Sequence, residues 1–174
     1  VLYYSYIFKN MTIILKNKDT LVFDDFCFKC SIGKNGLSRH KREGDLRTPK
    51  GNFNIDCLYY RSDRIKKPET KLKVIAIKKE MGWCNDINYK KKYNKVIKVS
   101  KKIRHEKMYR LDHKYDLVIP IKYNFKKPII GKGSAIFLHL TKNYKSTAGC
   151  IALNQNDFLI LLKLINRKTK IKII

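Results

Sequence analysis

Short hydrophobic runs, separated by polar and turn-forming residues, recur along most of the chain. Runs of this length bounded by turn residues are typical of β-strands. They occupy residues 11–16, 20–24, 26–32, 51–60, 72–78, 95–100, 116–121, 134–140, 149–153 and 171–174. Between them, residues 31–53 and 78–94 are predicted as long loops. Strands this short and this closely spaced predict a mainly β sandwich or barrel, not a doubly wound α/β sheet.

One segment near the C-terminus has a helical period instead. Asn154 is a suitable N-cap, and Asp157 follows it three residues later, as in a capping box. The apolar residues at i, i+3, i+4 and i+7 are Phe158, Leu161, Leu162 and Ile165. We therefore predict a helix over about residues 155–167, packed against the β-structure.

The 174 residues suit a single domain whose core needs no metal or disulfide to hold it together. Residues 1–10 precede the first clear strand and are interpreted as an extension. They have no basic residue ahead of their apolar residues and no small-residue cleavage site, so they match a signal peptide poorly. The longest apolar run, residues 158–162, is too short to cross a bilayer. We predict no transmembrane segment and a monomeric protein.

Basic residues far outnumber acidic ones. Forty Lys and Arg against 14 Asp and Glu give a net charge of +26, a field that attracts polyanions such as nucleic acid or carboxylate-rich polymers. The lysines occur in every segment, however, which also fits a solvated basic surface. A basic nucleic-acid-binding module is therefore kept as a hypothesis from a second functional class.

The five cysteines lack the spacing of a disulfide framework or a zinc site. Cys27 and Cys30 form a C-x-x-C sequence, but they lie in a predicted strand, where residues three apart point to opposite faces. The four histidines show no H-x-x-x-H pattern. We therefore predict no metal and no cofactor.

His139 and Cys150 are the candidate chemical couple. They lie in neighbouring predicted strands, which a hairpin would bring together, and an imidazole beside a thiol can activate it as a nucleophile. Gly149 allows a tight turn before Cys150, and backbone N–H groups there could serve as an oxyanion hole. The same two side chains also fit an ordinary core, so residue chemistry alone leaves both interpretations open.

Residues 136–153 resemble the signature of the L,D-transpeptidase (YkuD-type) catalytic domain. In that family a histidine is followed, after a loop, by [Ser/Thr]-x-Gly-Cys and an apolar residue, as in His139 and the segment Thr147-Ala148-Gly149-Cys150. The upstream segment GDLRTPKGNFNI, residues 44–55, resembles the family's Thr-Pro-x-Gly-x-Phe segment. The likeness extends over about residues 20–174.

The resemblance implies a β-sandwich-like catalytic fold and cysteine-dependent acyl transfer on peptidoglycan stem peptides, with no cofactor and no nucleic acid. Cys150 would be the nucleophile and His139 the proton donor and acceptor. Gly149 would supply an oxyanion-hole N–H, with Thr147 in support. The third member of the triad in this family is often a backbone carbonyl. An L,D-carboxypeptidase that hydrolyses the same peptides is the alternative within the family.

Two positions depart from the family pattern: Ala148 stands where many members have His, and Ala152 stands where Arg is common. These departures concern how the acyl donor is held. Arginine binds carboxylates through two parallel hydrogen bonds. Other arginines and aromatic residues are therefore candidates to hold the acyl donor in place of the missing His and Arg. The candidates are Arg61, Arg64, Tyr60 and Trp83. The resemblance also implies a periplasmic or envelope location, whereas the poor signal peptide leaves the cytoplasm open.

Overall fold

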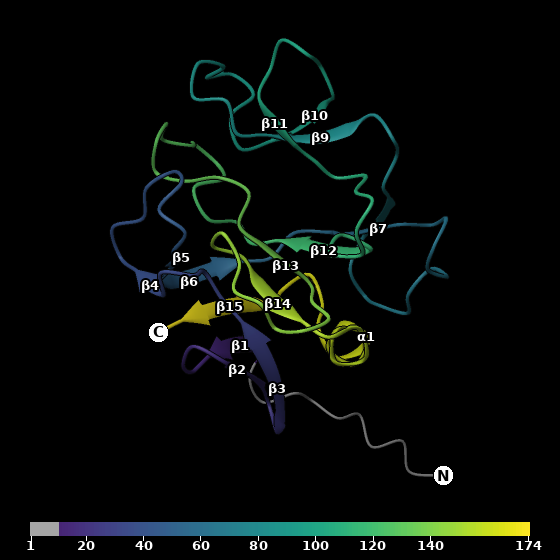
Figure 1. The fold of residues 1–174 in the computed structure, drawn as a ribbon. Helices are drawn as coiled ribbons and strands as arrows, with labels where there is room; N and C mark the ends of the chain where they lie inside the picture. Colours follow the sequence, from purple (N-terminus) through teal and green to yellow (C-terminus); the bar gives the residue numbers. More distant parts are fainter. Residues whose placement is uncertain (1–10) are drawn as a thin grey trace.

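The computed structural model describes residues 11–174 as two sheets, a short strand pair and one helix (Figure 1). The interpretation of residues 1–10 as an extension lies outside these described residues. The larger sheet has ten strands, in the spatial order β6 (Gly51–Asn54), β15 (Lys170–Ile173), β1 (Thr12–Leu15), β2 (Thr20–Phe23), β3 (Phe26–Ser31), β14 (Ile151–Leu153), β13 (Phe137–Leu140), β12 (Leu117–Pro120), β7 (Leu58–Tyr60) and β8 (Val74–Ala76). A three-stranded sheet has the order β10 (Val96–Lys98), β9 (Met81–Cys84) and β11 (His105–Lys107), and β4 (Leu37–Ser38) pairs with β5 (Thr48–Pro49).

The large sheet curls back on itself. Its edge strand β6 leads into Ile55, which forms a β-bridge with Ile121 just after β12. Backbone hydrogen bonds from Asp56 N to Pro120 O (2.9 Å) and from Lys122 N to Asn54 O (2.8 Å) flank this bridge. The curl surrounds the main apolar core, so the prediction of a mainly β fold is confirmed.

The helix α1 (Gln155–Leu164) directly follows β14 and buries Phe158, Leu161 and Leu162 in this core. Asn154 is its N-cap, and the Asn154 side chain accepts a hydrogen bond from Asp157 N at 2.9 Å, as expected from the sequence. The helix ends at Leu164, earlier than the predicted residue 167. It ends there because Ile165 is extended (φ −87°, ψ 160°).

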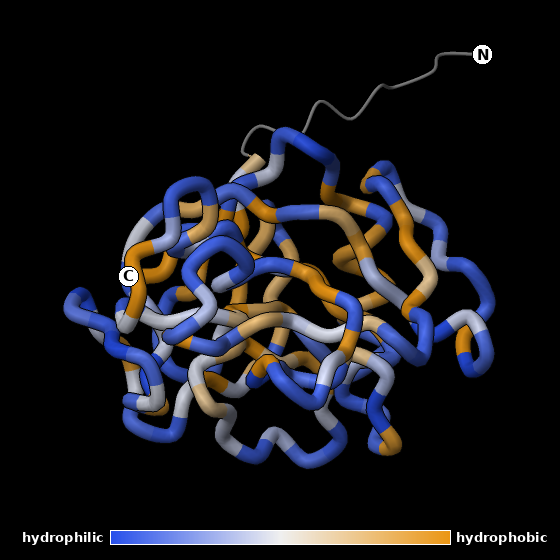
Figure 2. The backbone as a smooth tube through the Cα atoms, turned by 90° about the horizontal axis from the view of Figure 1, so that it is seen from above, coloured by the Kyte–Doolittle hydropathy of each residue, from blue (hydrophilic) through white to orange (hydrophobic). Residues whose placement is uncertain are grey.

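A second apolar cluster lies on the opposite face of the large sheet, between β7, β12 and β13 and the three-stranded sheet. It includes Tyr59, Val118 and Phe137 from the large sheet and Trp83 and Met108 from the segment that covers them. Strands β12 and β13 are consequently buried on both faces. Figure 2 shows the hydrophobic segments concentrated inside and the hydrophilic ones in the outer loops.

The structure also differs from the sequence prediction in its strands. The predicted run 51–60 is divided into β6 and β7 by the bridge at Ile55. The predicted loop 78–94 contains β9, the central strand of the small sheet. Strands β13 and β14 pair in parallel, with His139 opposite Ala152, so they do not form the predicted hairpin. In contrast, Cys27 is exposed and Cys30 is buried, which confirms that they face opposite ways.

Candidate active site

The turn that leads into Cys150 is held by the side chain of Thr147. The Thr147 hydroxyl donates a hydrogen bond to Cys150 O (2.6 Å) and accepts one from Gly149 N (3.1 Å). Thr147 N in turn donates to Ile32 O (2.8 Å), which ties the turn to the segment after β3. Thr147 therefore fixes the backbone on both sides of Gly149.

Gly149 occupies a position that no other residue could take without movement. Its φ is +138°, which L-residues rarely adopt, and a Cβ atom there would lie 2.7 Å from Arg47 O. The close approach brings the loop that contains Arg47 directly against the turn. In this structure the Gly149 N–H is bound to the Thr147 hydroxyl, so it is not aimed into the adjacent cavity.

The Thr-Pro-Lys-Gly segment supports this turn from behind. Thr48 is fully buried, and its hydroxyl accepts a hydrogen bond from Gly33 N at 2.9 Å. Gly33 forms a β-bridge with Thr147, and Lys34 N donates to Thr147 O at 2.9 Å. The two motifs noted in the sequence are thus parts of one structural unit, in which the upstream motif positions the downstream one.

The Cys150 thiol is buried, with 7% of the residue exposed, and it is held by two backbone groups. It donates to Ala135 O at 3.3 Å and accepts from Phe137 N at 3.3 Å. Burial raises the pKa of the Cys150 thiol to about 12, and the negative charge of Glu106 adds to this effect. The thiol is therefore protonated in this resting structure.

The His139 imidazole comes from β13 and is also buried, with 6% of the residue exposed. Its Nδ1 lies 2.9 Å from Leu140 O. Because a carbonyl only accepts, Nδ1 carries the hydrogen and Nε2 keeps a free lone pair. Burial lowers the pKa of His139 to about 4, against the smaller raising effect of the Leu140 carbonyl. The resting pair is therefore neutral, with no imidazolium to lower the Cys150 pKa.

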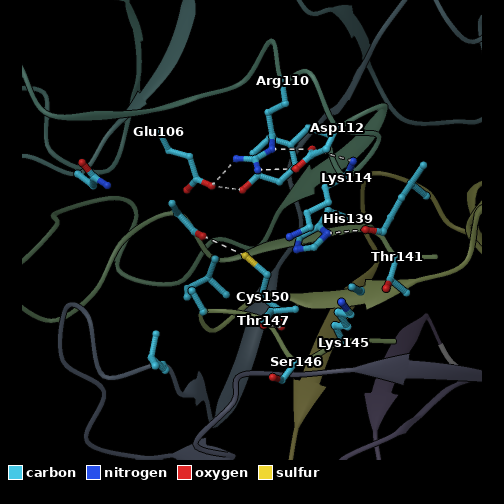
Figure 3. A pocket seen from close by; sticks show the side chains of 18 of the residues that line it. Glu106, Arg110, Asp112, Lys114, His139, Thr141, Lys145, Ser146, Thr147 and Cys150 are labelled. Atoms are coloured by element: carbon cyan, nitrogen blue, oxygen red, sulfur yellow. Dashed lines mark hydrogen bonds and ion pairs between the residues drawn. The ribbon is translucent and has the colours of Figure 1, made fainter. Parts of the chain in front are cut away.

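Both side chains line a cavity of about 780 Å³. Figure 3 shows them projecting into it from adjacent strands. The wall that carries them consists of β13, β14 and the loop 141–148, and we call it the strand wall. The facing wall consists of β11 and the segment 108–115, and we call it the charged wall.

The charged wall is built from paired ionic groups. Arg110 donates two hydrogen bonds to the carboxylate of Asp112 (2.8 and 2.6 Å), and its Nη1 lies 3.8 Å from Glu106 Oε1. The Tyr115 hydroxyl donates to Glu106, and the Tyr115 ring packs edge-on against the His139 ring with centroids 5.5 Å apart. Burial raises the pKa of Glu106. Glu106 and Tyr115 thus bring a carboxylate and a phenol close to the Cys150 and His139 pair (Figure 3).

The structure does not bring the four predicted binding residues to this cavity; those that line it do not include Arg61, Arg64, Tyr60 or Trp83. Arg61 is buried and donates to Asp63 (2.8 and 2.7 Å) and to Arg110 O (2.6 Å). Arg64 donates to Asp116 at 3.0 Å. Both guanidinium groups therefore already have partners within the fold.

The two aromatic residues pack in the interior. Tyr60 packs against the main core, and Trp83 is fully buried in the second cluster. The Trp83 indole N–H donates to Asn94 Oδ1 at 2.9 Å. Neither ring is placed to contact a molecule in the cavity.

Sequence reasoning missed Glu106, Arg110 and Tyr115. They lie in a segment of mixed charge that has no motif and no strong hydrophobic period. Only the folded structure shows that this segment lies near Cys150. The one signal in the sequence is the separation of Arg110 from Glu106 by four residues, which is common on any charged surface.

A known protein family matches nearly the whole chain. The family model of the L,D-transpeptidase catalytic domain, YkuD, matches residues 6–173, which extends the resemblance noted in the sequence toward the N-terminus. No curated protein and no solved structure matches the chain significantly. With a family match over nearly the whole chain, the chain belongs to the YkuD family of L,D-transpeptidase catalytic domains, which act on peptidoglycan.

Proposed function

We propose that this protein is a cysteine acyltransferase that joins peptidoglycan stem peptides. The observation that carries the proposal is the placement of Cys150 and His139 in one cavity, with the His139 Nε2 lone pair free and the Cys150 backbone fixed by Thr147. A neutral imidazole is the form that can accept the thiol proton.

The proposed reaction has two steps. In the first, the Cys150 S–H proton moves to His139 Nε2 while Sγ bonds to the carbonyl carbon of a stem-peptide residue. The bond from that carbon to the terminal D-amino acid then breaks, and the leaving nitrogen takes the proton from His139. In the second, the amine of another stem attacks the thioester, its proton passes through His139, and the Cys150 thiol is restored.

The negative oxygen that forms during each step needs hydrogen-bond donors. We propose the backbone N–H groups of Gly149 and Cys150 for this role. Because the Gly149 N–H is bound to the Thr147 hydroxyl at 3.1 Å in the resting structure, this donor has to exchange partners when substrate binds.

The donor carboxylate needs a cationic partner, since Ala152 offers none. Lys114, Lys142 and Lys145 line the cavity and are exposed. None of the three forms an ion pair with a carboxylate of residues 11–174. We propose that these three amines bind the carboxylate of the acyl donor.

Reaction with stem peptides tests the function. The protein is incubated with disaccharide tetrapeptides, and the products are separated by mass spectrometry. We expect crosslinked dimers from the wild type and none from Cys150→Ala. Shortened stems without dimers would instead identify an L,D-carboxypeptidase, and dimer formation by Cys150→Ala would refute the assignment of the nucleophile.

An envelope location follows from this substrate and is part of the same proposal. Within residues 11–174, the helix that the structure describes is too short to span a membrane.

A further inference from the structure

Ala135, just before β13, has an unusual backbone conformation. Its φ is +52°, in the left-handed region that alanine seldom occupies because Cβ crowds the following carbonyl. Such a conformation persists only where neighbouring groups hold it, and it often marks a functional position. The residue lines the cavity and lies fifteen positions before Cys150 in the chain.

The group that holds Ala135 is the side chain of Asn94. Asn94 Oδ1 accepts hydrogen bonds from Ala135 N (3.0 Å) and from Trp83 Nε1 (2.9 Å). Asn94 Nδ2 donates to Tyr123 O (3.1 Å) and Asn124 O (2.8 Å). The side-chain amide therefore uses its oxygen for two donors and its nitrogen for two acceptors, so its orientation is fixed.

The carbonyl of the same Ala135 residue accepts the Cys150 thiol at 3.3 Å. Asn94 is buried and does not itself line the cavity. The chain of contacts thus runs from the Asn94 amide to the Ala135 backbone and from there to Sγ. A carbonyl oxygen at this position stabilises the S–H form and repels a thiolate.

We propose that Asn94 is a positioning residue that holds the Ala135 carbonyl against Cys150 Sγ, where it accepts the hydrogen of the resting thiol and disfavours the thiolate. The S–H bond must turn away from Ala135 O before His139 Nε2 can accept its proton. This inference deepens the proposed function and relies on it for the role of Cys150 as nucleophile, but the protonation of the thiol can be measured without any substrate.

Other charged and titratable groups also act on this thiol. Burial disfavours the Cys150 thiolate most, and the negative charge of Glu106 on the charged wall acts in the same direction. A Cys150 thiolate would in turn disfavour ionisation of Tyr115. Positive charges on Lys41 and Arg110 act in the opposite direction. His139 lies on the same strand wall. None of these groups is itself replaced by a substitution at residue 94.

Alkylation with iodoacetamide as a function of pH tests the proposal, with modification of Cys150 followed by peptide mass spectrometry. We expect Asn94→Ala to speed alkylation of Cys150 at neutral pH about tenfold, because one hydrogen bond to the thiol form is lost. Asn94→Leu, which also removes the side-chain amide but fills more of the space, should have the same effect.

Two controls make the result decisive. Cys27 is exposed and reports the reagent's rate within the same sample. Asn166→Ala removes the same side-chain amide outside the cavity and should leave the pH profile unchanged. If Asn94→Ala does not fold, Asn94→Leu decides alone. A folded Asn94→Ala or Asn94→Leu variant with the wild-type alkylation profile would overturn the inference. If the profile shifts but the wild-type protein forms no crosslinked dimers from stem peptides, only the proposed function is refuted.

Discussion

The two walls of the cavity differ in how they are built. On the strand wall, Cys150 and His139 are uncharged and buried, and their polar atoms bind backbone groups. On the charged wall, Glu106, Arg110 and Asp112 are partly exposed and bind one another through side chains. Backbone partners within a sheet cannot move independently, whereas side-chain pairs can exchange for a ligand.

We propose that this difference separates chemistry from recognition. Cys150 and His139, the proposed reacting groups, lie where the fold fixes their geometry, held by Thr147 and the loop that contains Thr48. The charged wall surrounds them with groups that can bind ammonium and carboxylate groups of a peptide. Substitutions on the strand wall should therefore affect rate and stability strongly, and substitutions on the charged wall should have smaller, graded effects.

Removal of the proposed base, His139, should have the largest effect. We expect His139→Ala to slow acylation by about 10²–10⁴-fold, because general-base assistance to the thiol is lost. The measurement is the rate of covalent adduct formation with a carbapenem, followed by intact mass. His113→Ala removes a histidine from the charged wall and should lose less than tenfold. Equal losses in both variants would contradict the separation of the two walls.

Gly149→Ala should destabilise the turn that leads into Cys150. The added Cβ would meet Arg47 O at 2.7 Å, at a φ of +138°. We expect the free energy of unfolding to fall by at least about 2 kcal/mol, measured by urea denaturation. Gly131→Ala is the matched control, since Gly131 also has positive φ (+80°) but no atom within 4 Å of the added Cβ. A similar loss in both would show that contact with Arg47 contributes nothing.

Asn154→Ala should lower stability by about 1 kcal/mol, because the N-cap of α1 loses its hydrogen bond to Asp157 N. The thermal midpoint should fall, while acylation by the folded protein changes little. Asn154→Ser keeps a good capping group and should recover most of the midpoint. If the serine variant is as unstable as the alanine variant, the loss does not come from the cap.

Glu106→Gln should have the smallest effect and act on the pH profile. The carboxylate of Glu106 raises the pKa of the Cys150 thiol, so its removal should lower that pKa and move alkylation to lower pH. We expect about threefold faster alkylation at neutral pH. Glu69→Gln removes an exposed carboxylate outside the cavity and is the control. A shift toward higher pH would contradict the arrangement described for the charged wall.

The strands of the large sheet and the helix with its cap could be predicted, because each depends on local sequence, and the motif pointed to His139 and Cys150. Periodicity defines strands and helices, and a motif records which residues occur together. The parallel pairing of β13 and β14 could not be predicted, since strand partners are chosen by packing across the whole sheet. Only the fold showed that Thr48 and Gly33 support the turn at Thr147.

The binding residues proposed from the sequence illustrate the same limit. Arg61 and Arg64 follow β7, and a guanidinium group has the chemistry to bind a carboxylate. Their partners are Asp63 and Asp116, carboxylates of the protein itself. A sequence gives the chemistry of a guanidinium group but not whether its partner is a ligand or a neighbouring aspartate, because that depends on distances between separate segments.

The most direct test of the central claim is the mass of the protein after a single turnover with a stem tetrapeptide and no acceptor. The account predicts an increase equal to the acyl tripeptide portion, with the terminal D-amino acid released, and peptide mapping should place the thioester on Cys150. An adduct on another residue, or one that persists in Cys150→Ala, would contradict it.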